Sequence, residues 1–294
     1  MCKEKFVDPF TDFGFKRVFG TEKGVLIQFL NTILEDEAPI VDLEYLNVER
    51  LGTIVQNRRA SFDLYCKTED NKHIIVELQR EPQAYFKERS VYYSSFAIQD
   101  SATKGKKWDF NLPHIYSISL LNFHLPPQNT KVVKKTPYKT TARLYDIETK
   151  ELWTPVLTYV YLEMKKFKKT IDQLKTFEDK WMYAINNLCE LDRCPEELKE
   201  ETFVKFFELA RIAAFTDAEK WEYESSLKEA RDQSNQFSYA EARGEAKGLA
   251  KGEVLGREKE KLAIARTMKA QGFSLDTIIA CTGLIPDALT ALDE

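Results

Sequence analysis

The sequence predicts a mixed α/β fold that is followed by a mainly helical C-terminal extension. The first observation is the order of its periodic segments, which over the first 165 residues runs helix, three strands, helix, strand. The second is composition: 294 residues with 43% hydrophobic and 12% aromatic content suffice for a sizeable core and are too apolar for a disordered chain. The third is a change near Thr170, beyond which helical patterns replace strand patterns.

The elements of the first part follow from spacing and turn residues. Apolar residues recur at helical spacing in 22–36, so this segment is a predicted helix that ends before Pro39. Strand-like runs follow at 41–49, 61–67 and 73–79, and the polar residues 68–72 favour a hairpin between the last two. The remaining predictions are a helix at 84–101, a buried strand at 114–123, and strands at 142–148 and 156–163.

The chain is expected to have three parts: a core at 1–165, a helical region at 166–235, and a glycine-repeat segment with a short helical tail at 236–294. The repeat places Gly244, Gly248, Gly252 and Gly256 four residues apart, near one face of a helix. Interior glycines weaken a helix, so we interpret 241–256 as a flexible, partly helical linker, with close helix–helix contact as the alternative. Helices are predicted after it at 258–271, which Gly272 ends, and at 274–281 and 286–292.

The formal net charge of −4 hides two segments of opposite sign. Between 103 and 143 there are eight basic residues and one acidic residue, whereas 171–232 holds nine basic and sixteen acidic residues. A basic segment beside a core favours a polyanionic partner, although a Lys-rich loop is also simply well solvated. The candidate phosphate contacts are Lys104, Lys106, Lys107, Lys131, Lys134 and Lys135.

Several protein classes are disfavoured by what the sequence lacks. No secretory signal and no unbroken apolar stretch of membrane-spanning length is visible, so we expect a soluble, cytoplasmic protein that does not enter a membrane. Five scattered cysteines and three histidines offer neither a disulfide framework nor a zinc motif. There is no phosphate-cradling glycine loop and no serine nucleophile turn.

The most informative polar residues lie in the predicted hairpin. Asp63 and Glu77 each interrupt an apolar strand, where a carboxylate is costly to bury without compensation. A divalent cation such as Mg²⁺ or Mn²⁺ is one compensation, and strand alternation puts Glu77 and Gln79 on one face. The alternative is that both acids face solvent or pair with Arg80 and Lys67.

Two further pairs are candidate members of the same site. Asp12 and Lys16 are four residues apart and share a face if this segment is helical, which allows either a place near metal and phosphate or a surface ion pair. Arg89 and Tyr92, three residues apart on the second helix, either face the site or form a core tyrosine satisfied by an arginine.

The arrangement resembles a known nuclease family. A strand aspartate, a polar hairpin and a hydrophobic-Glu-x-Gln sequence are similar to the PD-(D/E)XK motif, with Gln79 in the lysine position. The segment 8–19, DPFTDFGFKRVF, resembles the N-terminal element of the recombination-promoting nuclease (Rpn) family, also called PD-(D/E)XK family transposases. Residues 85–99 are similar to that family's core helix, and the C-terminal part resembles the family more loosely.

The resemblance implies a restriction-endonuclease-like core and a Mg²⁺- or Mn²⁺-dependent endonuclease that cuts DNA and promotes recombination. Asp63, Glu77 and the carbonyl of Leu78 would be the metal ligands. Gln79 carries no charge and cannot be a general base, so it would position the attacking water by hydrogen bonds. The alternative is an inactive nuclease-like core in a DNA-binding or assembly protein, and a homo-oligomer formed through the helical C-terminal region is a further expectation.

Overall fold

The computed structural model describes residues 5–35, 37–46, 49–50, 60–61, 63–101, 110–126 and 137–285, with the backbone alone at 49–50 and 60–61. Within these ranges lie the elements that position the site. The chain divides into two compact units, Met1–Asp232 and Gln233–Glu294. Each unit is described by itself.

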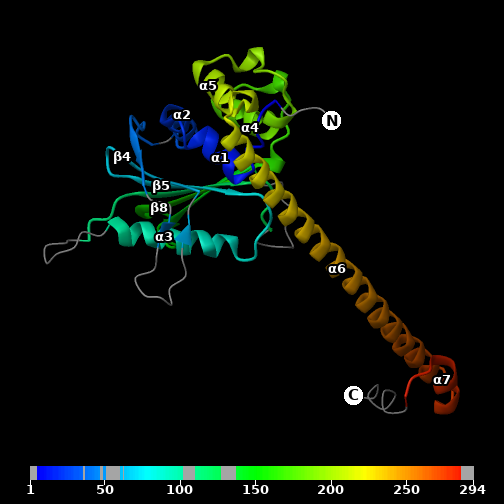
Figure 1. Ribbon diagram of the computed structural model, residues 1–294. Coiled ribbons are helices and arrows are strands. Elements are labelled where there is room, and N and C mark those ends of the chain that lie inside the picture. The colour runs from blue at the N-terminus through cyan, green and yellow to red at the C-terminus, as the bar shows by residue number, and fades with distance from the viewer. Residues whose placement is uncertain are drawn as a thin grey trace. The chain divides into compact units, whose positions relative to one another are not determined.

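A six-stranded mixed sheet forms the centre of the first unit (Figure 1). In spatial order the strands are β1 (Leu43–Tyr45), β4 (Leu64–Thr68), β5 (His73–Gln79), β6 (Ile115–Leu121), β8 (Leu152–Glu163) and β7 (Lys139–Tyr145). Three neighbouring strands, β5, β6 and β8, are parallel to one another; β4 and β7 pair with the outer two of these in antiparallel fashion, and β1 pairs antiparallel with β4. A separate two-stranded sheet pairs β2 (Glu49–Arg50) with β3 (Ala60–Ser61).

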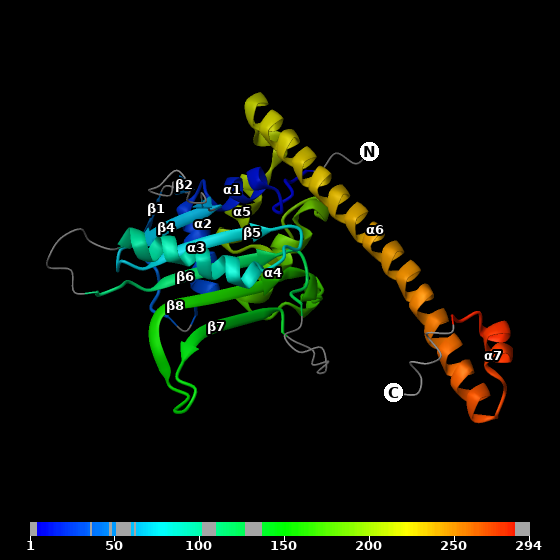
Figure 2. The same cartoon turned by 90° about the horizontal axis from the view of Figure 1, so that it is seen from below.

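Helices cover both faces of the six-stranded sheet, which explains why β6 is buried along its whole length and β5 along most of it. The α-helices are α1 (Asp12–Phe19), α2 (Lys23–Ile33), α3 (Phe86–Ser101), α4 (Phe177–Asn187), α5 (Glu201–Ala210), α6 (Asp217–Ala270) and α7 (Leu275–Thr282). Short 3-10 turns lie at η1 (Met164–Lys166), η2 (Ile171–Gln173), η3 (Leu188–Glu190), η4 (Glu196–Leu198) and η5 (Ile212–Ala214). Figure 2, viewed from below, shows α3 alone crossing one face of the strands.

The main core lies on the face opposite α3. There α1, α2, α4 and α5 pack on the even-numbered side chains of β5 and β6, such as Val76 and Ile118. Trp181 of α4 is fully buried, with its ring beside Phe19, Phe29, Phe203 and Phe206. Residues far apart in the chain therefore share one core, which fixes α1 and the sheet together.

The second unit contains the C-terminal part of α6 and the short helix α7. Ala265 and Ile278 form its small apolar core. Gly272 ends α6 in the left-handed region with φ +83, a conformation that favours glycine. A Cβ added at Gly244, Gly248, Gly252 or Gly256 would meet no atom within 4 Å.

The structure confirms the mixed α/β class, the hairpin, and the helix at 84–101 that is observed as α3. The strand predicted at 142–148 is wrong at its end, because Asp146 accepts hydrogen bonds from the Glu148 and Thr149 N–H groups and forms a turn. The predicted linker at 241–256 and the helix start at 258 also differ, since α6 is continuous through both.

Other predictions concern segments that the structure leaves undescribed. The helix predicted at 286–292 lies outside the described residues.

Within the described part of the chain, no helix combines the length and apolarity needed to cross a membrane.

Candidate active site

The β4–β5 hairpin brings Asp63 and Glu77 together. The antiparallel register places Leu64 opposite Val76, so that Asp63, one residue before β4, reaches the C-terminal half of β5. The Leu78 N–H donates a hydrogen bond to Oδ2 of Asp63 over 2.6 Å. The main chain of Asp63 lies beside the Glu77 carboxylate and lowers its pKa. The hairpin therefore sets the two carboxylates next to each other, with Asp63 held by the main chain of β5.

Burial dominates the electrostatics of this carboxylate pair. Glu77 has only 8% of its surface exposed, and Asp63 is half-buried. Loss of solvent raises the pKa of Glu77, and the nearby charge of Asp63 raises that pKa further. Burial also raises the pKa of Asp63, against a lowering by its hydrogen bond from Leu78. Two buried acids that resist ionisation form a site that a cation would stabilise.

One oxygen of this pair has no hydrogen-bonding partner. Oε1 of Glu77 is buried and is not hydrogen-bonded to any described residue. Arg80, which the sequence offered as a possible partner of the acids, instead forms an ion pair with Asp8 at 2.7 Å. The reading of Asp63 and Glu77 as solvent-facing residues does not fit the observed burial of Glu77.

Three of the four accessory candidates, Asp12, Lys16 and Arg89, lie close enough to shift the pKa of Asp63 or Glu77. The charges of Lys16 and Arg89 lower the pKa of Asp63, and the charge of Asp12 raises it. Arg89 also lowers the pKa of Glu77, so its guanidinium lies within electrostatic range of both acids. Tyr92 is instead largely exposed and packs edge-on against Phe96 at 5.1 Å between ring centres.

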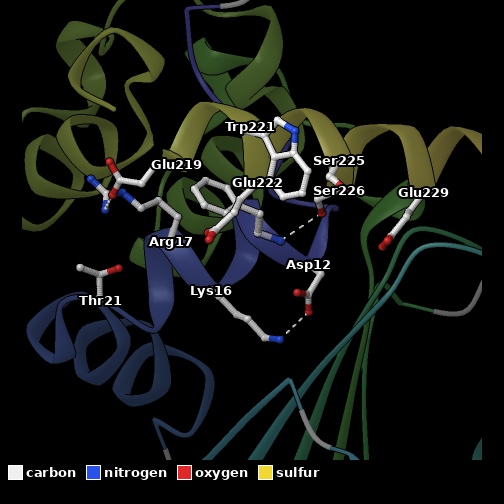
Figure 3. Close-up of a pocket in the computed structure, with 11 residues that line it drawn as sticks. Asp12, Lys16, Arg17, Thr21, Glu219, Trp221, Glu222, Ser225, Ser226 and Glu229 are labelled. Carbon is white, nitrogen blue, oxygen red and sulfur yellow. Dashed lines mark hydrogen bonds and ion pairs between the residues drawn. The ribbon is translucent and has the colours of Figure 1, made fainter. Parts of the chain in front are cut away.

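Asp12 and Lys16 form the surface ion pair that helical spacing allowed, at 2.7 Å. They also line a cavity of about 460 Å³ between α1 and the first turns of α6 (Figure 3). Three further carboxylates, Glu219, Glu222 and Glu229, line this cavity, whereas Arg17 is bound to Glu219. An excess of acids disfavours phosphate, so the cavity does not extend the carboxylate pair into a nucleic-acid groove.

Gln79 lies on the same strand face as Glu77 but does not contact the carboxylates through its amide nitrogen. Its Nε2 donates to the carbonyl of Glu81 at 3.2 Å. The last paired residues of β4 and β5 at this end of the hairpin are Leu64 and Val76, and just past them the Leu78 N–H points toward Asp63. Because the N–H and C=O groups of one strand residue point to the same side, the Leu78 carbonyl also faces the side on which Asp63 lies.

Ser119 of β6 lies next to Glu77 and was not among the residues predicted from the sequence. Its Cα lies opposite that of Glu77 in the parallel β5–β6 register. The residue is fully buried, and its Oγ has no hydrogen-bonding partner among the described residues. The available signal was the alternation of Ser117 and Ser119 within an otherwise apolar strand, which places both hydroxyl groups on one face.

The basic segment is only partly described. Lys104, Lys106, Lys107, Lys131, Lys134 and Lys135 all lie outside the described residues. Two other members of the segment are engaged in ion pairs: Lys139 with Glu178 at 2.5 Å, and Arg143 with Glu37 at 2.6 Å. These two cations are therefore compensated within the protein.

A mixed sheet flanked by helices, with a buried carboxylate pair on a central hairpin, is consistent with the nuclease class of α/β proteins. The sequence matches the family described as PD-(D/E)XK nuclease family transposase over residues 9–240, and the chain belongs to this family. The match spans the whole sheet and the carboxylate pair. Membership assigns a nuclease-like function with DNA as the substrate class. No curated protein and no solved structure matches the chain significantly.

Proposed function

We propose that the protein is a metal-dependent DNA endonuclease of the recombination-promoting type, with Asp63 and Glu77 as its catalytic carboxylates. The observation that carries the proposal is the pair itself: two neighbouring acids on one hairpin, with Asp63 held by the Leu78 N–H and with Oε1 of Glu77 buried and unpartnered among the described residues. A buried acid without compensation is costly, and a bound cation supplies that compensation.

The residues at the pair fit Mg²⁺ or Mn²⁺ in their chemistry. Asp63 and Glu77 offer carboxylate oxygens and Leu78 offers a carbonyl oxygen, the donor types that these hard cations prefer. Among described residues no three His, Cys, Asp or Glu side chains form a metal-binding group, so the third protein ligand would come from the main chain. When bound, such a cation lowers the pKa of a coordinated water and stabilises charge on a phosphate.

The remaining site residues have roles that follow from their charge. Arg89 lies within electrostatic range of both acids and would attract the scissile phosphate. Lys16 also lies within range of Asp63, but it would reach a phosphate only by leaving its ion pair with Asp12. Gln79 would hold the attacking water through a hydrogen bond, once its amide is released from the Glu81 carbonyl. The six lysines between 104 and 135 would bind the DNA backbone on either side of the cut.

Plasmid nicking tests the proposal directly. Wild-type protein should convert supercoiled plasmid to nicked or linear forms with Mg²⁺ or Mn²⁺, and chelation should abolish the conversion. Asp63→Ala and Glu77→Ala should be inactive, whereas Asp70→Asn, at the opposite end of the same hairpin, should cleave normally. Equal nicking by wild type and both alanine variants would refute the assignment.

A second function is DNA binding or assembly by an inactive core, and the long exposed helix α6 is the observation that favours it. The C-terminal unit would then supply the interaction, as a homo-oligomer formed through the long exposed face of α6. Metal-independent DNA binding without cleavage, together with concentration-dependent sedimentation, would support this function over the first.

A further inference from the structure

Two unpartnered polar atoms lie next to each other on the face of the sheet that α3 covers. Ser119 is 0% exposed and its Oγ has no partner among the described residues. Oε1 of Glu77 is likewise buried and has no hydrogen-bonding partner among the described residues. The parallel register sets the two residues opposite each other, so their side chains project side by side from adjacent strands.

Two hydroxyl groups that α3 brings to this face already have partners. Ser94 of α3 hydrogen-bonds the hydroxyl of Tyr159 over 2.8 Å. Ser90, one turn earlier on the same helix, donates to the Phe86 carbonyl over 3.0 Å and lies beside the hydroxyl of Tyr161. Tyr161 is opposite Ser119 in the β6–β8 register, so its hydroxyl could otherwise have been the neighbour that satisfied Ser119. Glu77 is thus the polar neighbour of Ser119 that retains an open acceptor.

We propose that Ser119 is a positioning residue for Glu77. Its hydroxyl donates a hydrogen bond to the Glu77 carboxylate when that group is ionised on a divalent cation, and it fixes which oxygen faces the metal. The inference rests on the proposed function, because it assigns Ser119 to the support of the same site. A metal-ligating carboxylate is normally held by such a donor, and loss of the donor weakens metal affinity.

The bond would form by rotation of the two side chains, which start from neighbouring positions on paired strands. The strands are fixed by ladder hydrogen bonds on both sides of β6, so neither backbone has to move. Serine is the smallest residue that brings a donor to this position without filling the space that the carboxylate needs. Alanine would pack equally well here and leave the carboxylate without its donor.

The test measures Mn²⁺ binding to the full chain by electron paramagnetic resonance, without DNA and without turnover. Ser119→Ala should weaken the affinity for Mn²⁺ by about tenfold. Ser117→Ala is the matched control, since Ser117 is buried on the same strand and face but lies opposite Ile75. Its affinity should equal that of wild type.

Two more variants separate positioning from packing. Ser119→Cys keeps the approximate size but is a weak donor, so its affinity should fall as in Ser119→Ala. Ser119→Thr keeps the hydroxyl and should restore most of the wild-type affinity. Metal-free unfolding of each variant reports whether the fold is retained, and the cysteine variant replaces the alanine variant if the latter does not fold.

The outcomes are distinct. Wild-type affinity in both Ser119→Ala and Ser119→Cys, or an equal loss in Ser117→Ala, overturns the role of Ser119 and leaves the proposed function intact. Absence of Mn²⁺ binding by wild type overturns the proposed function and the role of Ser119 with it. Weakened binding in the alanine and cysteine variants, with recovery in the threonine variant, supports the role.

Discussion

Replacement of Glu77 by glutamine should stabilise the metal-free protein at high pH. Burial, and then the charge of Asp63, raise the pKa of Glu77 above its ordinary value of 4.5. The folded protein therefore keeps a proton that the unfolded chain releases above about pH 4.5. The free energy of unfolding must fall as the pH rises from there through the raised pKa. Glutamine has nearly the same shape and binds no proton, so this loss should disappear.

The size of the effect follows from the shift. Each unit by which the pKa is raised corresponds to about 1.4 kcal/mol of stability lost once the pH exceeds the folded-state value. A rise of the Glu77 pKa to about 8 would thus make Glu77→Gln more stable than wild type by about 4 kcal/mol at pH 8. Near pH 5 the two proteins should have similar stability, because Glu77 is protonated when folded.

Urea denaturation in chelator at pH 5 and pH 8 measures this difference. Asp70→Asn, which alters an exposed turn carboxylate whose pKa is lowered, is the control and should not gain stability at pH 8. If wild type and Glu77→Gln lose stability in parallel between the two pH values, Glu77 is not held protonated by burial. The reasoning on the carboxylate pair would then be wrong.

Two other predictions concern metal and packing. Mn²⁺ at about 100 times its dissociation constant should stabilise the wild-type protein by about 2.7 kcal/mol at pH 8. The stabilisation should be smaller at pH 5.5, because protons compete with the metal for the carboxylates. Thermal unfolding measures both values, and an equal stabilisation of Glu77→Gln would contradict the prediction. Gly14→Ala should destabilise the fold by about 1–3 kcal/mol in urea, because its Cβ would lie 2.0 Å from the carbonyl oxygen of Asp8. Gly24→Ala in α2 should instead stabilise the fold by about 0.5–1 kcal/mol, because the nearest atom to the added Cβ would be 3.6 Å away. Equal effects of the two substitutions on the free energy of unfolding would refute the close packing described at Gly14.

Local signals in the sequence predicted much of the fold. The polar turn after β4 is an example, since the Thr68 hydroxyl accepts from the Lys72 N–H and Asn71 takes the positive φ. The helix at 84–101 could be predicted from the composition of that segment alone. Strand limits were less predictable: β1 ends at Tyr45 because its pairing with β4 ends there, and pairing is not a local property.

The site was predictable in its acids and less so in their surroundings. Asp63 and Glu77 stand out because each interrupts an apolar strand. Ser119 does not, since its importance depends on which strand lies beside β5, and that strand is 42 residues away in the chain. Helical spacing suggested both Arg89 and Tyr92: the charge of Arg89 reaches both acids, whereas Tyr92 is exposed, and the roles of both stay predictions.

Location of the cation is the most direct test of the central claim that the Asp63–Glu77 pair is a metal site. Crystals of the full chain soaked in Mn²⁺ should give an anomalous difference peak in contact with the carboxylates of Asp63 and Glu77 and the carbonyl of Leu78. Glu77→Ala crystals treated in the same way should lack that peak. Wild-type crystals with no peak at the pair, or with Mn²⁺ bound only elsewhere, would contradict the account.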